Sequence, residues 1–129
     1  IENNGLKQAA RECGKGIISF SPLSQGMLTD RYLHGIPSDS RVVTDGRFLH
    51  KEQLDEKRIH TIRQLNDLAV ERGESLAQMA LKWVLKDNDV TSVLIGASKP
   101  EQILENLKVI DAAPFTEEEL KKIDEISLT

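Results

Sequence analysis

The fold of this 129-residue chain is decided by residues 90–107, VTSVLIGASKPEQILENL. The run 90–95 is apolar and has the length of a strand. The small residues at 96–98 then turn the chain into a helix that Pro100 opens, because proline suits the first helical position. The order of strand, tight turn and helix is typical of an α/β fold.

A second strand is expected upstream, at residues 17–20, where the sequence IISF is the nearly continuous apolar run of a parallel strand with both faces covered. It ends in a turn at residues 21–26. Two amphipathic helices follow: one stops at Gly73, and the other begins at Ser75, whose spacing to Gln78 is that of a capping box. Helical connections between strands imply that the strands pair in parallel.

The helix after residue 98 is expected to have two faces. Ser98 and Glu101 have the spacing of a capping box, so Ser98 is the predicted N-cap. The apolar residues of the helix predict a buried stripe of Ile103, Leu104, Leu107 and Ile110. A different face, expected to be solvated, carries the polar residues Gln102, Glu105 and Asn106 at positions i, i+3 and i+4.

Composition and charge narrow the classes of function. A net charge of -4 argues against nucleic-acid binding, which needs a clustered excess of Lys and Arg. No apolar run approaches the roughly 18 residues of a membrane helix, and the single cysteine, Cys13, cannot form an internal disulfide. We therefore expect a cytoplasmic protein without nucleic-acid or membrane partners. The three histidines lack metal-ligand spacing, so no metal site is predicted.

The turns at 21–26 and 96–98 are the candidate ligand sites, because both follow the carboxyl ends of strands, where α/β proteins bind ligands. The first offers hydroxyl and N–H groups, although a purely structural turn would have the same sequence. The second leads into a helix N-terminus, which attracts anions, and Gly96 permits close approach of a phosphate. Ordinary capping by Ser98 explains this second turn equally well.

Two strands are too few for a closed barrel or a complete doubly wound sheet. The chain also begins with Ile1 rather than Met. We therefore expect residues 1–129 to be a single partial domain that lacks an N-terminal part and has open sheet edges.

Three motifs resemble the aldo-keto reductase family. Residues 18–32, ISFSPLSQGMLTDRY, are similar to the segment after the seventh barrel strand, residues 77–85, AQMALKWVL, to a family helix, and residues 94–106, LIGASKPEQILEN, to the eighth-strand cofactor motif. The resemblance implies the C-terminal part of a (β/α)8 TIM barrel, with its last strands and helices plus a C-terminal helix. The sequence Gly96-Ala97-Ser98 resembles the branch with bacterial glyceraldehyde-3-phosphate reductases and potassium-channel β-subunits.

The same resemblance implies a binding site for NADP(H). The first turn would hold the pyrophosphate and nicotinamide side of the cofactor through Ser21, Pro22, Leu23 and Gly26. Arg31 and Arg41 match basic positions of a loop that closes over the cofactor. Gly96 and Ser98 match the turn for the 2′-phosphate, and Gln102, Glu105 and Asn106 match residues that reach the adenosine.

The function implied is that of an NADPH-dependent oxidoreductase that reduces aldehyde or ketone carbonyls to alcohols, with this chain as its cofactor-binding half. The family's catalytic Tyr, Lys, Asp and His lie on strands that no part of this chain matches, so no catalytic residue is assigned. Tyr32 falls on the cofactor loop. The alternative is a non-catalytic, NADP-bound regulatory subunit resembling the channel β-subunits. The sequence is compatible with a homo-oligomer.

Overall fold

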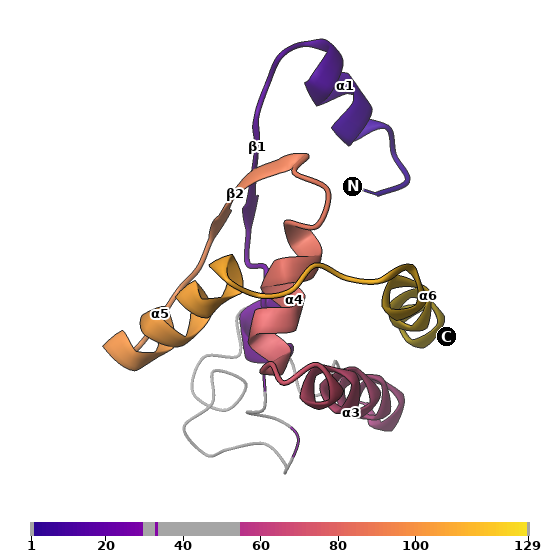
Figure 1. Ribbon diagram of the computed structural model, residues 1–129, viewed down its shortest axis with the longest axis vertical. Helices are drawn as coiled ribbons and strands as arrows, with labels where there is room; N and C mark the ends of the chain where they lie inside the picture. The colour runs from indigo at the N-terminus through magenta and orange to yellow at the C-terminus, as the bar shows by residue number, and fades with distance from the viewer. Residues whose placement is uncertain (1, 30–32, 34–54, 129) are drawn as a thin grey trace.

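The computed structural model describes residues 2–29, 33 and 55–128. Arg31, Tyr32 and Arg41, assigned above to the cofactor loop, lie outside these residues. In chain order the elements are α1 (Leu6–Glu12), β1 (Ile17–Phe20), the 3-10 turn η1 (Ser24–Gly26), α3 (Glu56–Glu71), α4 (Leu76–Val84), β2 (Val90–Leu94), α5 (Pro100–Leu107), the 3-10 turn η4 (Lys108–Ile110) and α6 (Glu117–Ser127) (Figure 1). Both predicted strands are present, and the α/β class is confirmed.

The two strands pair in parallel, as the helical connection between them predicts. The register places Ile18 opposite Ser92 and Phe20 opposite Leu94. Both strands therefore end at the same edge of the sheet, and the turns that follow them leave from that edge. This pairing brings together two segments that are more than 70 residues apart in the chain.

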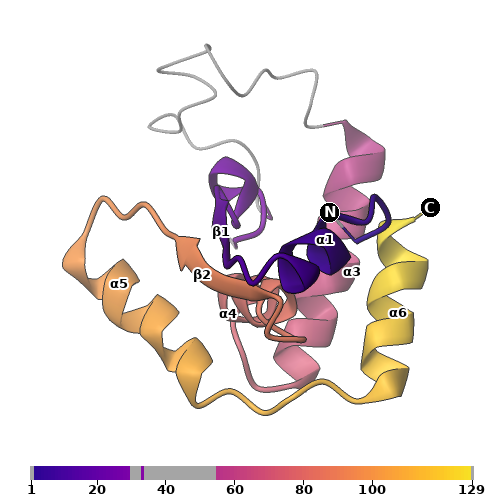
Figure 2. The ribbon, with the colours of Figure 1, turned by 90° about the horizontal axis from the view of Figure 1, so that it is seen from above.

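Helix α4 lies at the centre of the helical layer, between α3 and the sheet, and it also contacts α5 (Figure 2). Helices α3 and α6 run side by side on the far side of α4. The core between them is formed by the buried residues Ile62, Leu65, Leu68, Ala69, Leu76, Met79 and Ile123. Because α4 is covered on more than one side, Leu81 is buried as well, 1% exposed.

The sequence predicted caps for two helices, α4 and α5. Ser75 and Gln78 form the predicted capping box of α4, and Thr116 and Glu119 form one at the start of α6. The predicted N-cap of α5, however, is wrong by one residue. The N-cap is Lys99, whose side chain has no acceptor, so the oxygen of the Gln102 side chain accepts from the Lys99 N–H instead (3.3 Å).

One face of the sheet is not covered by the described residues. Ile18 is 65% exposed, Phe20 78% and Leu94 58%. Ile17 and Ser19, which alternate with them on β1, are half-buried, because successive side chains of a strand point to opposite faces. The expectation that β1 has two covered faces is therefore wrong for the described part of the chain, where one face of the sheet is open.

The predicted burial of α5 is wrong for its apolar stripe and for Asn106. The apolar stripe is exposed, with Ile103, Leu104, Leu107 and Ile110 each at least 46% accessible. Asn106 and Val109 are the buried residues of this segment, and the α5–η4 segment contacts α4. The periodicity identified residues that share a face correctly. In the described part of the chain, however, Asn106 is buried, whereas the apolar stripe and Gln102 are exposed.

Arg72 joins the end of α3 to the start of α6. Its guanidinium pairs with Glu74 at 3.0 Å and with Glu119 at 2.6 Å, and it donates to the Ala113 carbonyl at 2.8 Å. It also lies over the Phe115 ring, 4.3 Å from the centroid. Burial alone would lower the pKa of Arg72, but the two carboxylates raise it. The buried cation thus fixes α6 against the core.

Candidate functional site

The candidate site is the edge of the sheet where β1 and β2 end. Phe20 and Leu94 are paired in the last register position, so the turn at 21–26 and the turn at 95–99 both start there. The carboxyl edge of a parallel sheet is the usual place for a ligand in α/β proteins. The parallel register thus joins the two turns that the sequence singled out.

The first turn is conformationally strained. Ser21, Ser24 and Gln25 all have positive φ, at 52°, 47° and 59°, and Gly26 follows at 93°. Each non-glycine residue in the left-handed region costs roughly 1–2 kcal/mol, and such residues are concentrated at functional sites. Internal hydrogen bonds hold the turn closed, including Ser24 N–H to the Ser21 carbonyl at 3.0 Å and Gly26 N–H to the Leu23 carbonyl at 2.9 Å. Ser21 is exposed, whereas Pro22, Leu23 and Gly26 are half-buried.

In the second turn, three donors converge on one oxygen. The Gln102 Oε1 atom accepts from Ser98 N–H at 2.8 Å, from Ser98 Oγ at 3.2 Å and from Lys99 N–H at 3.3 Å. Gly96 is exposed, and nothing lies within 4 Å of the position that a Cβ would occupy there. The backbone at this turn is therefore accessible, and its donors face one acceptor, as they would face an oxygen of an anion.

Glu105 is held by two groups. Its Oε1 atom accepts from Gln78 Nε2 at 2.8 Å, and its Oε2 atom pairs with Lys108 at 2.6 Å. The sequence did not identify Gln78 or Lys108 as parts of the site. One signal for Gln78 was present in the sequence. It occupies the third position of a capping box, and its amide offers donors as well as the acceptor that the box needs.

Asn106 is buried in α5, although its side chain is polar. It is only 6% exposed, and no hydrogen bond to its side-chain amide is found among the described residues. A buried polar group without a partner costs about 1–3 kcal/mol, and a ligand or ion is one of the explanations of such a group. The predicted solvent exposure of Asn106 is wrong, but its burial strengthens the reasons for considering it a binding residue.

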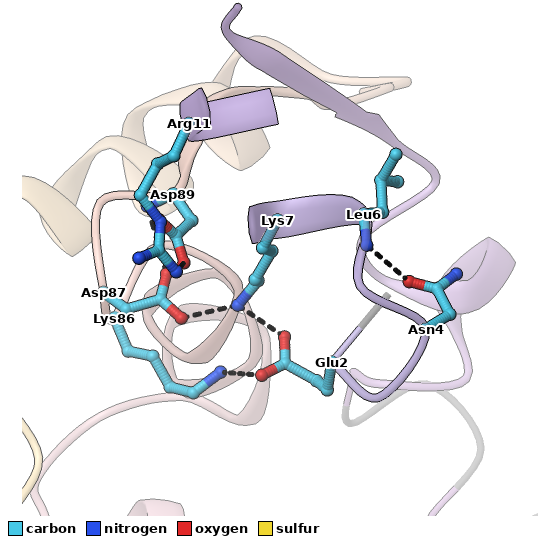
Figure 3. Close-up of polar contacts among 8 residues, drawn as sticks. All are labelled: Glu2, Asn4, Leu6, Lys7, Arg11, Lys86, Asp87 and Asp89. Carbon is cyan, nitrogen blue, oxygen red and sulfur yellow. Dashed lines mark hydrogen bonds and ion pairs between the residues drawn. The ribbon is translucent and has the colours of Figure 1, made fainter. Parts of the chain in front are cut away.

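A second polar cluster lies at the opposite, amino-terminal ends of the strands (Figure 3). Lys7 pairs with Glu2 at 2.6 Å and with Asp87 at 2.5 Å, and Lys86 pairs with Glu2 at 3.2 Å. Arg11 pairs with Asp89 at 2.7 Å. Each of these charges has an opposite charge beside it, so the cluster ties the N-terminal segment to the turn before β2.

These ion pairs shift the titration of the groups involved. Burial alone would raise the pKa of Glu2, but hydrogen bonds from Lys7 and Lys86 lower it below its ordinary value. The pKa of Asp87 is lowered in the same way, by Lys7 and the Asp89 N–H against the effect of burial. The pKa of Lys7 is raised, because its two carboxylate partners outweigh burial. All three shifts favour the charged forms.

Metal binding and membrane insertion find no support in the described part of the chain. Its His, Cys, Asp and Glu residues form no group of three that could hold a metal ion. None of its helices has the length and apolar character needed to cross a bilayer.

Comparison with known proteins agrees with the motifs. The chain is 46% identical over 128 residues to an L-glyceraldehyde 3-phosphate reductase of Escherichia coli, covering 97% of this chain and 37% of that protein. It is 42% identical over 122 residues to a protein named as a voltage-gated potassium channel subunit beta in Schizosaccharomyces pombe, covering 88% of this chain and 34% of the relative. These two relatives are of the kinds that the sequence resemblance named.

Solved structures provide a further comparison. A glycerol dehydrogenase of Gluconobacter oxydans matches with a TM-score of 0.71 and 27% identity, covering 94% of this chain and 36% of that one. The chain thus spans little more than a third of the length of these three proteins. The profile of the aldo/keto reductase family matches residues 1–128, and the chain therefore belongs to that family.

Proposed function

We propose that this chain is the cofactor-binding part of an NADP(H)-dependent oxidoreductase that reduces aldehyde or ketone carbonyls to alcohols. Residues 1–129 would form a single partial domain, the C-terminal part of a (β/α)8 barrel. The names of two relatives, a reductase and a dehydrogenase, support an oxidoreductase. The exposed apolar face of the sheet and the exposed stripe of α5 support a partial barrel, since the remaining strands and helices would cover them.

The observation that carries the proposal is the convergence of three donors at the start of α5. Ser98 N–H, Ser98 Oγ and Lys99 N–H all meet the Gln102 oxygen, and a 2′-phosphate oxygen could take the place of that oxygen. Gln102 would then act as an internal substitute for the phosphate, and it would move aside when the cofactor binds. The open space at Gly96 would admit the phosphate to the backbone.

The other site residues receive roles according to their positions. The strained turn at 21–26 would present its backbone to the pyrophosphate and nicotinamide side, and Asn106 would donate its free amide to the adenosine beside Glu105. Bound NADPH would supply the hydride. None of the site residues named here would donate the proton. Arg31 and Arg41, which lie outside the described residues, would close over the cofactor.

The experiment is a titration of the intact protein with NADPH and NADH, followed by assays of NADPH oxidation with short aldehydes and ketones. We expect tighter binding of NADPH than of NADH, because a charge-assisted phosphate contact is worth about 1.5–3 kcal/mol. A protein that binds neither cofactor would contradict the proposal. The relationship to a channel β-subunit favours one alternative, an NADP-bound regulatory subunit, which predicts cofactor binding without turnover of any carbonyl tested.

A further inference from the structure

Gln78 has a hydrogen-bonding pattern that capping alone does not explain. It is 6% exposed and belongs to α4, yet its amide reaches α5. Its Oε1 atom accepts from Ser75 N–H at 3.0 Å, which completes the capping box. Its Nε2 atom donates to the Glu105 carbonyl at 3.0 Å and to the Glu105 Oε1 atom at 2.8 Å.

A capping box requires only an acceptor at this position, and glutamate would serve as well as glutamine. What glutamine adds is a pair of donor hydrogens, and both face Glu105. One reaches the Glu105 carbonyl in the last turn of α5, which also accepts a backbone N–H at the C-cap of the helix. The other holds the carboxylate itself. The donors of Gln78 therefore link the first turn of one helix to a side chain of another.

The two partners of the Glu105 carboxylate differ in kind. Lys108 is an i,i+3 neighbour, and this pair is exposed, with 66% of the Lys108 side chain and 46% of the Glu105 side chain accessible. Exposed ion pairs of this type contribute little and do not fix a side chain. Gln78 is buried and reaches Glu105 from a different helix. The orientation of the carboxylate is therefore determined mainly by Gln78.

We infer that Gln78 is a positioning residue for the adenosine end of the cofactor site. It acts through Glu105, which it contacts from α4. The inference rests on the proposed function, in which Glu105 contacts the adenosine. Gln78 itself would not touch the cofactor. Its effect on binding should therefore require both the Glu105 carboxylate and the adenosine half of the ligand.

The test uses Gln78→Glu in the intact protein. Glutamate preserves the shape and the acceptor for Ser75 N–H, but it removes the donors and places a negative charge beside the Glu105 carboxylate. We expect the Kd for NADPH to rise about tenfold, while the Kd for reduced nicotinamide mononucleotide, which lacks the adenosine, changes less than about twofold. In a Glu105→Ala background, Gln78→Glu should change the Kd for NADPH by less than about twofold, because coupled residues are not additive.

Ser75→Ala is the matched control, since it breaks the same capping box and leaves the bonds from Gln78 to Glu105 in place. We expect a lower Tm and an unchanged Kd for NADPH. If Gln78→Glu behaves like this control, or weakens both ligands equally, Gln78 has only a structural role and the inference is wrong. If Glu105→Ala binds NADPH like the parent, the assignment of Glu105 to the adenosine fails instead.

Discussion

The polar groups at the two ends of the strand pair differ in whether they have partners. At the amino-terminal end, Glu2, Asp87 and Asp89 are paired with Lys7, Lys86 and Arg11, so the six charges sum to zero (Figure 3). At the carboxyl end, three non-glycine residues of one turn have positive φ, against one, Asn88, in the turn before β2. The buried amide of Asn106 has no hydrogen-bond partner among the described residues.

We interpret this difference as a division between residues that stabilise the fold, before the strands, and residues that bind a ligand, after them. Paired charges before the strands contribute to the folded state, whereas strain and an unpaired amide after the strands lower its stability and are expected where a ligand later supplies the missing contacts. The same division of the two faces is general in α/β barrels. The variants below test whether the two ends differ in this way.

The largest effect is expected at the amino-terminal end, from Lys7→Met. The Lys7 side chain is 9% exposed, and its removal takes the ion-pair partner from Asp87 and one of two partners from Glu2. Loss of one partner of a buried pair costs 3–5 kcal/mol, and the partial exposure of both carboxylates reduces this to about 1–3 kcal/mol. Chemical denaturation should show the loss, with NADPH affinity unchanged. A variant as stable as the parent would show that these pairs do not hold the segment.

At the carboxyl end, Asn106→Leu should have the opposite effect on stability. Leucine has nearly the same shape and removes the unpartnered amide, so the free energy of unfolding of the cofactor-free protein should rise by about 1–2 kcal/mol. The affinity for NADPH should fall about tenfold, equivalent to about 1.4 kcal/mol. Thermal melts and a fluorescence titration measure the two quantities. Lower stability together with unchanged affinity would mean that Asn106 has a structural partner.

Lowering the pH should weaken the ion pairs of Glu2 and Asp87 at the amino-terminal end of the strands. Because the pKa values of Glu2 and Asp87 are lowered on folding, their contribution is fully present above the ordinary values of 4.5 and 3.8 and is lost as the pH falls through the lower values of the folded state. Each contribution should be about 1 kcal/mol or less, since both side chains are more than a third exposed. The unfolding free energies of the parent and Lys7→Met should therefore converge between pH 5 and about pH 2.

The smallest effect is expected from Ser21→Gly. Glycine relieves the positive φ of 52°, and this gain offsets the greater entropy that glycine loses on folding, so stability should change by less than about 0.5 kcal/mol. Ser92→Gly is the control, because Ser92 lies within β2 and should lose about 0.5–1 kcal/mol. Equal losses in the two variants, measured by denaturation, would mean that the first turn is not strained.

The sequence determined the elements and the family. Apolar runs located both strands, and the periodicity and turn residues located α3 and α4, because these signals are local. The capping box at Ser75 was predicted for the same reason. The two turns after the strands were identified as the candidate site because strand ends are visible in a sequence and the motifs there are distinctive.

Only the tertiary structure decided which face of each element is covered. A hydrophobic pattern shows that Ile103 and Leu107 share a side of α5, but not that α4 meets the other side, where Asn106 is buried. The N-cap at Lys99 depends on the reach of the Gln102 side chain, and the bond from Gln78 to Glu105 joins residues 27 positions apart. Such contacts are set by how the helices pack, because packing selects one neighbour among many that the local sequence permits.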